Sequence, residues 1–308
     1  MKRHIKQIGI YLLALCVGVL FTQCEKDRLL TKTDDQNTDA PNTYTAGFSV
    51  SSGTTVYFSP GNLQWSATGT HAISGGGTAS GRWRFAEHQW DIIGEDNQNI
   101  SSSYRGWIDL FGWGTSGYNS KYPYMTSTNY SDYGNGENNI AVTNYDWGVY
   151  NAIYNPETKT TDAPGTWRTL TKDEWVWLLD SRSTSSGIRY AKATVNGICG
   201  LIIVPDNWST STYTLNSTNS SSASYSNNVI SATNWITLEN AGAVFFPAAG
   251  YRVGTSVYYV GSCGLYWSAT CSLSNDAYCL SFYSSLLNPS GYSSRSGGQS
   301  VRLVRSAE

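Results

Sequence analysis

The stretch that decides the fold is residues 261–305, GSCGLYWSATCSLSNDAYCLSFYSSLLNPSGYSSRSGGQSVRLVR. Aromatic, arginine and glycine residues recur in it as short words, and the positions between them have no hydrophobic period. From 261 to 298 there are eleven Ser and four Tyr, and no Lys, Glu, Gln, His or Met. Tyr, Ser, Gly and Asn are typical of binding surfaces such as paratopes. A Ser/Asn/Gly-rich surface loop of a secreted protein has the same composition, so composition alone leaves both interpretations open.

Four words of this stretch resemble the variable region of target proteins of diversity-generating retroelements: YWSAT at 266–270, AYCLSF at 277–282, NPSGYSSR at 288–295 and GQSVRLVR at 298–305. Those targets are C-type-lectin-like lipoproteins of gut bacteria, similar to the formylglycine-generating-enzyme fold and to the Fib-succ-major paralogous domain. Similar words occur upstream, among them FSVSSGTTVYFSPGNLQW at 48–65, WRTLTKDEWVWLLDSR at 167–182 and GAVFFPAAGYRVGTSVYYVGS at 242–262. The resemblance therefore covers about residues 44–305.

The resemblance implies a rigid scaffold, the frame residues Trp267, Phe282, Arg295 and Arg302. The residues between them would form one exposed, concave and diversified face within 261–298. The side chains expected to contact a ligand, the contact residues, are Cys263, Leu265, Cys271, Leu273, Asn275, Asp276, Cys279, Ser281, Tyr283, Ser284, Leu286, Tyr292, Ser293, Ser294 and Ser296. Tyr283 and Tyr292 are the expected aromatic anchors, and Leu265, Leu273 and Leu286 the expected apolar patches, because few anchors carry most binding energy. Diversification in such proteins yields NNY codons, which cannot encode Lys, Glu, Gln, Met or Trp.

Length and charge bound the remaining possibilities. A chain of 308 residues corresponds to one or two domains, and one large domain is allowed. Charged residues make up 14% of the chain and the formal net charge is −2. A nucleic-acid-binding protein needs a clustered basic surface, so we expect no nucleic-acid partner. The expected partner is a surface protein or a glycan.

The N-terminus is typical of an exported lipoprotein. Basic residues precede an apolar run from Ile8 to Phe21, which is short for a membrane span, and Cys24 follows. We expect a signal peptide over 1–23, lipidation of Cys24, a flexible tether over 24–45, and one ligand-binding domain over 46–308. An uncleaved anchor and ordinary secretion are the alternatives. The expected location is the outer membrane, attached by lipid only, with surface exposure favoured over a periplasmic orientation.

The cysteines do not define a disulfide framework. Without Cys16 and Cys24 the chain retains Cys199, Cys263, Cys271 and Cys279, which allow three pairings. Sequence cannot choose among them. Three of the four lie at suspected variable positions, which favours accidents of diversification.

Two helices are predicted. Thr171 and Glu174 form a capping box, followed by apolar residues on one helical face. A second helix is predicted from Ser231 to a C-cap at Gly242. Strands are predicted over 46–65 as a hairpin turning at Gly53, and over 83–85, 188–193, 195–204, 244–246 and 301–304, with a turn at Asn196-Gly197. The pattern predicts an α+β domain with two short helices, small antiparallel sheets and much ordered irregular chain.

No word predicts catalysis, a metal site or a cofactor. His71 and His88 lie far apart, and the calcium-dependent sugar-binding motifs of C-type lectins do not occur. Asp96, Asp132 and Glu137 are expected in solvated loops. We therefore expect a binding protein that acts without a cofactor. The alternatives are a structural or adhesive surface lipoprotein, and a divergent carbohydrate-active enzyme using Glu87 or Asp146.

Overall fold

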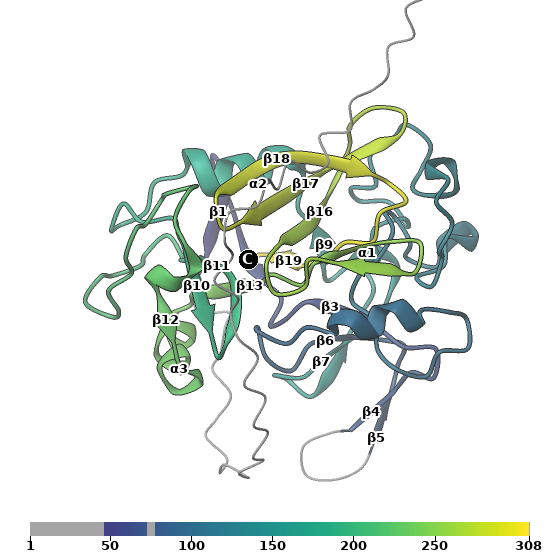
Figure 1. Cartoon of the computed structure of the whole chain (residues 1–308), viewed down its shortest axis with the longest axis horizontal. Helices are drawn as coiled ribbons and strands as arrows, with labels where there is room; N and C mark the ends of the chain where they lie inside the picture. The colour runs from purple at the N-terminus through teal and green to yellow at the C-terminus, as the bar shows by residue number, and fades with distance from the viewer. Residues whose placement is uncertain (1–45, 73–77, 308) are drawn as a thin grey trace, which may run out of the picture. The chain divides into compact units, whose positions relative to one another are not determined.

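The computed structural model describes residues 46–72 and 78–307. The predicted signal peptide, Cys24 and the tether over 24–45 lie outside the described residues. Small sheets and short helices alternate along the described chain, with long irregular connections between them (Figure 1). This arrangement is α+β, which confirms the class that the sequence predicts.

The sheets are small and mostly antiparallel. The N-terminal sheet has the order β1 (Phe48–Ser51), β2 (Thr54–Phe58), β19 (Leu303–Ser306), β9 (Arg168–Thr169). A second has the order β12 (Val229–Ile230), β10 (Tyr190–Val195), β11 (Ile198–Ile203), β13 (Val244–Pro247). A third has the order β3 (Leu63–Trp65), β6 (Trp83–Phe85), β7 (Ile153–Asn155), β8 (Thr160–Asp162). Two hairpins pair β4 (Thr70–Ala72) with β5 (Thr78–Ser80) and β14 (Tyr251–Val253) with β15 (Ser256–Tyr258).

The C-terminal sheet is an antiparallel meander of β16 (Gly264–Cys271), β17 (Asp276–Tyr283) and β18 (Leu286–Ser294). The surface-loop interpretation of this stretch is therefore wrong. The sheet was hidden in the sequence because side chains on both faces of β16 and of the middle of β17 are buried, which removes the polar–apolar alternation of a half-exposed strand. Irregular pairing between Trp267 and Cys271 and between Cys279 and Ser281 further breaks the period.

The helices are α1 (Trp147–Tyr150), α2 (Lys172–Val176) and α3 (Ala232–Asn240), and α2 continues as a π-helical turn over Trp177–Ser181. Short 3₁₀ turns occur at Gly94–Asn99, Tyr118–Ser120, Tyr130–Asp132 and Tyr225–Asn227. The predicted capping box of α2 is confirmed: Thr171 Oγ1 accepts from the Glu174 amide at 3.3 Å, and Glu174 Oε2 accepts from the Thr171 amide at 2.8 Å. Ser231 caps α3 as predicted, and Gly242 follows its last turn at a φ of 89°. The short helix α1 was not predicted.

The predicted turns at Gly53 and Asn196-Gly197 are confirmed, since β1 pairs with β2 and β10 with β11. The predicted strand over 301–304 is displaced to β19. Its first residues leave the ladder because the Val301 carbonyl accepts from the Leu63 amide at 2.9 Å. Within the described residues, none of the helices has the length and apolar character needed to cross a bilayer.

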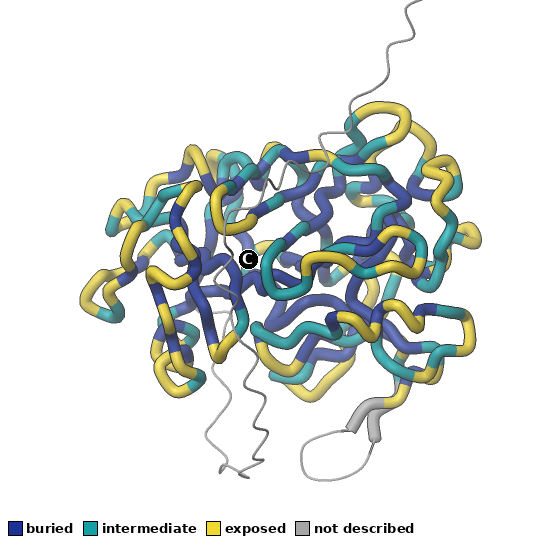
Figure 2. The backbone as a smooth tube through the Cα atoms, viewed as in Figure 1, coloured by how far each residue is buried: buried dark blue, intermediate teal, exposed yellow. Residues whose placement is uncertain are grey.

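Two hydrophobic clusters meet at the C-terminal sheet. One face contributes Tyr266, Leu280, Phe282 and Leu287 to a cluster that also contains Trp175 of α2. The other face contributes Trp267, Ala269, Ala277 and Cys279 to a tryptophan-rich cluster. Trp113 and Trp147 of this cluster come from the irregular segment, which is residues 86–152 between β6 and β7. The middle of the sheet is consequently buried on both sides, and its turns are exposed (Figure 2).

Arg252 of β14 joins the irregular segment to the β14–β15 hairpin. It is fully buried, and its guanidinium donates to the carbonyl oxygens of Leu110, Met125 and Gly254 at 2.8–2.9 Å. Burial lowers the pKa of Arg252 to about 10. The charge is thus retained at neutral pH and is solvated by backbone dipoles.

Replacing Arg252 with Met keeps most of the side-chain volume but removes every donor. We expect the unfolding free energy to fall by on the order of 3 kcal/mol, because three carbonyls lose a charged donor. Urea unfolding of R252M beside R105M tests this, since Arg105 is exposed. Equal unfolding midpoints of the two variants would contradict the role assigned to Arg252.

Candidate functional site

The exposed side chains of the C-terminal sheet lie at its two ends. Leu273, in the β16–β17 turn, is 70% exposed, and Tyr292 of β18 is 65% exposed. Tyr283, at the β17–β18 turn, is 39% exposed. The seven residue steps of β17 from Asp276 to Tyr283 span about 23 Å. The most exposed groups are therefore divided between the two ends of the strand, and a single contact face across the sheet stays a prediction.

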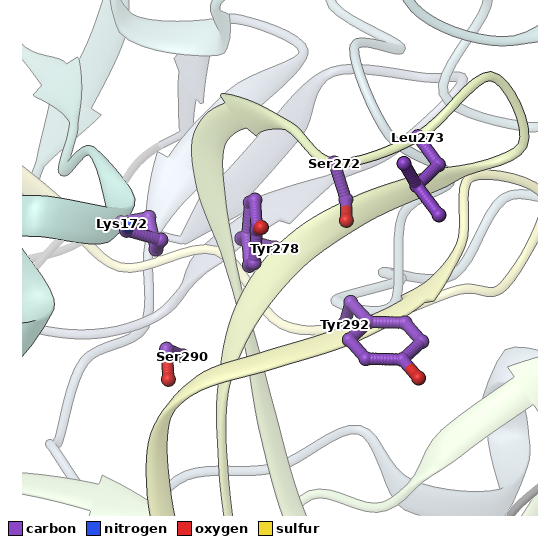
Figure 3. Close-up of a pocket in the computed structure, with 6 residues that line it drawn as sticks. All are labelled: Lys172, Ser272, Leu273, Tyr278, Ser290 and Tyr292. Carbon is purple, nitrogen blue, oxygen red and sulfur yellow. The ribbon is translucent and has the colours of Figure 1, made fainter.

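The end that carries Leu273 contains an open pocket of about 460 Å³, which we call the Leu273 pocket. It is lined by six residues: Lys172, Ser272, Leu273, Tyr278, Ser290 and Tyr292. Figure 3 shows Lys172 and Ser290 on one side of it and Leu273 and Tyr292 on the other, with Tyr278 and Ser272 between them. The pocket therefore has a cationic, hydroxyl-bearing side and an apolar side.

Strand register brings the two tyrosines together. Tyr278 of β17 and Tyr292 of β18 are cross-strand partners, so their side chains leave the same face of the sheet. Their neighbours Cys279 and Gly291, also paired, belong to the opposite, buried side. Alternation along the strands thus places the partly exposed Tyr278 and the exposed Tyr292 directly beside buried residues.

The turn that carries Leu273 is fixed from several sides. The guanidinium of Arg295 donates to the carbonyl oxygens of Ser274 and Gly136, and it lies 5.9 Å from the Trp113 ring centroid. The Cys271 amide donates to Asn139 Oδ1 at 2.9 Å. These contacts attach the turn to the irregular segment, so the backbone that carries Leu273 is fixed by hydrogen bonds.

Lys172 comes from the first turn of α2. Its amide donates to Thr270 Oγ1 at 3.0 Å, and this hydrogen bond attaches the first turn of the helix to β16. Its ammonium lies 2.8 Å from Asp173 Oδ1 and 5.4 Å from the Tyr278 ring centroid. The hydrogen bond to Asp173 raises the pKa of Lys172. The pocket therefore keeps a positive charge at its edge.

All four frame residues are buried: Trp267, Phe282, Arg295 and Arg302. The indole of Trp267 donates to the Phe111 carbonyl at 2.7 Å, and that of Trp113 donates to the Ser268 carbonyl at 2.8 Å. Arg302 donates to Gln89 Oε1 at 2.8 Å, and burial lowers its pKa to about 10.

The contact residues fall into three groups. Five are exposed: Leu273, Asn275, Tyr283, Ser284 and Tyr292. Eight are partly exposed: Cys263, Leu265, Cys271, Asp276, Ser281, Leu286, Ser293 and Ser294. Two are buried, Cys279 and Ser296, so only thirteen of the fifteen could reach a ligand.

The assignments of Cys279 and Ser296 as contact residues are corrected by their burial. Cys279 is 1% exposed, and the alternation of side chains along β17 places its side chain in the tryptophan-rich cluster. Burial raises the pKa of this free thiol to about 12. Ser296 is 7% exposed, and its hydroxyl lies 2.9 Å from that of Ser294 in a tight turn.

Sequence reasoning missed four pocket residues: Lys172, Ser272, Tyr278 and Ser290. Tyr278 belongs to the motif AYCLSF and was not predicted to contact a ligand. Pairing it with Tyr292 in a β-meander would have placed both side chains on one face. Lys172 gave no such signal, because it is far from the C-terminal stretch in sequence.

The structure thus defines an α+β domain whose C-terminal sheet carries an open pocket with aromatic, hydroxyl and cationic groups. Residues 205–304 match the model of a family described as a domain of unknown function (DUF8237). No curated protein and no solved structure matches the chain. The matched segment contains the whole C-terminal sheet, whereas Lys172 lies upstream of it.

The carboxylates considered for catalysis are in different surroundings. Asp146 is fully buried and accepts hydrogen bonds from the amides of Gly148 and Thr169 and from the Thr169 hydroxyl, at 2.9–3.1 Å. It caps α1 and has no access to a substrate. Glu87 is exposed, and the adjacent His88 faces Asp91 at 3.2 Å. Among the described residues, no three His, Cys, Asp or Glu side chains are grouped so that they could hold a metal ion.

Burial raises the pKa of Asp146 from 3.8 to about 6, and hydrogen bonds oppose this only in part. A carboxyl group with a raised folded-state pKa stabilises the fold below its unfolded pKa and loses that contribution as pH rises through about 6. Asp146→Asn removes this titration. We therefore expect the unfolding free energy of D146N, relative to wild type, to rise by about 2 kcal/mol between pH 4 and pH 7.

Chemical denaturation at several pH values measures this difference, and the exposed Asp96→Asn provides a matched control. A D146N profile parallel to the wild-type profile would show that Asp146 does not titrate in this range.

Proposed function

We propose that this protein is an exported, lipid-anchored binding protein that recognises a protein or glycan ligand, non-covalently, through its C-terminal sheet. The proposal includes a C-type-lectin-like fold of the kind found in target proteins of diversity-generating retroelements. Support comes from the α+β class, the small sheets and the ordered irregular segment. It also comes from the words 266–270, 277–282, 288–295 and 298–305, which lie on the C-terminal sheet and the strand after it.

The observation that carries the proposal is the Leu273 pocket at one end of the C-terminal sheet. Leu273 and Tyr292 are more than half exposed, although the sheet that carries them contributes residues to two hydrophobic clusters. Large apolar and aromatic groups held in solvent by a rigid backbone are available as binding anchors. Their exposure is compatible with a surface that buries them when a partner binds.

Diversification would act on these exposed positions at little cost to the fold. Substituting Tyr292 or Leu273 removes no core packing, whereas substituting Trp267 or Phe282 opens a cavity. Tyr, Leu, Ser and Asn, the residues at the exposed positions, can all be encoded by NNY codons. Absence of NNY codons at these positions, together with absence of a nearby template repeat and reverse transcriptase gene, would exclude diversification.

Anchoring follows from the N-terminal sequence. Lipid on Cys24 would hold the protein at the outer membrane, and the segment over 24–45 would separate the domain from the bilayer.

Tyr292→Ala should weaken ligand binding about tenfold or more, because truncating an aromatic anchor commonly costs over 1 kcal/mol. The measurement is titration of a ligand found on glycan and protein arrays. Tyr150→Ala is the matched control, since Tyr150 of α1 is 41% exposed and lies outside the C-terminal sheet. Tyr283→Ala should not affect a small glycan, because Tyr283 lies five residue steps, about 17 Å, along β17 from Tyr278, the cross-strand partner of Tyr292.

Equal affinities of Y292A, Y150A and wild type for every array ligand would contradict the proposed site.

A further inference from the structure

We propose that the Leu273 pocket binds an acidic segment of a protein partner, with a carboxylate at Lys172 and an adjacent apolar side chain at Leu273 and Tyr292. This inference rests on the proposed function and names the ligand class of the same site.

The first argument concerns the origin of the pocket residues. Five of the six come from 261–298, the segment suspected of diversification, and Lys172 comes from α2. Lys cannot be encoded by NNY codons, so diversification of the C-terminal segment could not produce a lysine there. Every diversified form would nonetheless retain Lys172. The pocket thus combines residues of a segment suspected of diversification with a lysine, Lys172, that lies outside that segment.

The second argument is that a carboxylate already sits at this charge. Asp173 Oδ1 lies 2.8 Å from Lys172 Nζ, which shows that the ammonium can receive an acidic group at the pocket edge. The Asp173 side chain is 88% exposed, so solvent screens the ion pair and its two charges attract each other only weakly. An ammonium has three donors, and Asp173 takes one. A ligand carboxylate can therefore share or replace this contact.

The third argument separates a peptide from a neutral sugar. None of the six pocket residues carries a carboxylate or amide side chain. An amide both donates and accepts hydrogen bonds, and a carboxylate has two acceptor oxygens, so both groups suit the hydroxyls of a sugar ring. Among the six side chains, the hydroxyls of Ser272, Tyr278, Ser290 and Tyr292 can donate or accept one hydrogen bond at a time. The one charged group, the Lys172 ammonium, provides donors only, and Leu273 and the Tyr292 ring provide apolar area (Figure 3). An Asp or Glu next to an apolar residue matches both sides of the pocket.

The test selects peptides from a phage-displayed random library on the full-length protein, and measures the selected peptides by fluorescence anisotropy at low and high salt. Lys172→Gln removes the cation and should weaken binding about two- to fivefold, the size of an exposed charge contact, with loss of the salt dependence. Asp173→Asn removes the internal competitor and should strengthen binding. Lys159→Gln is the matched control, because Lys159 is exposed in the turn between β7 and β8.

The expected result is a selected consensus of Asp or Glu beside apolar residues, with opposite effects of K172Q and D173N and none of K159Q. The inference is overturned if no consensus emerges, if the consensus lacks acidic residues, or if K172Q binds like K159Q. Binding of a neutral glycan that depends on Tyr292 but not on Lys172 would also overturn it, and would leave the proposed function in place. If Y292A binds every probe like wild type, the proposed function itself fails.

Discussion

The double burial of the C-terminal sheet is the constraint on which the rest of the structure depends. Adjacent residues of β16, Tyr266 and Trp267, point to opposite faces and enter different hydrophobic clusters. Each also makes a buried hydrogen bond, Tyr266 to the Pro247 carbonyl at 2.8 Å and Trp267 to the Phe111 carbonyl at 2.7 Å. A slip of one residue would exchange the two faces and break both bonds, so the register is fixed.

This constraint decides where contact groups can lie. The middles of β16 and β17 pack into the hydrophobic clusters, and the fully exposed side chains lie at the turns and near the strand ends. Arg295 extends the rigidity to the β16–β17 turn by joining the Ser274 carbonyl to the irregular segment through Gly136. Affinity gained from such a surface comes from anchors held in place before a ligand arrives, which limits the entropy lost on binding. The same rigidity allows side chains to change without refolding the domain.

Local signals in the sequence predicted local structure well. The capping box at Thr171, the turn at Asn196-Gly197 and the α+β class each depend on a few neighbouring residues. The candidate site depends on register and on contacts across the chain, which composition does not encode. Tyr278 and Cys279 illustrate this, because these adjacent residues lie on opposite faces of β17, where Tyr278 is partly exposed and Cys279 is buried. Lys172 joins the pocket because α2 packs against the C-terminal sheet, in part through the hydrogen bond to Thr270, a residue 98 positions away in the chain.

The central claim is that the fold depends on the buried positions of the C-terminal sheet and is indifferent to the exposed ones. Two libraries test it most directly, one randomised at Leu273, Tyr283 and Tyr292 and the other at Trp267, Leu280 and Phe282, each scored for protease resistance on a display platform. The account predicts that most members of the first library stay folded and that few members of the second do. Similar folded fractions in both libraries would contradict it.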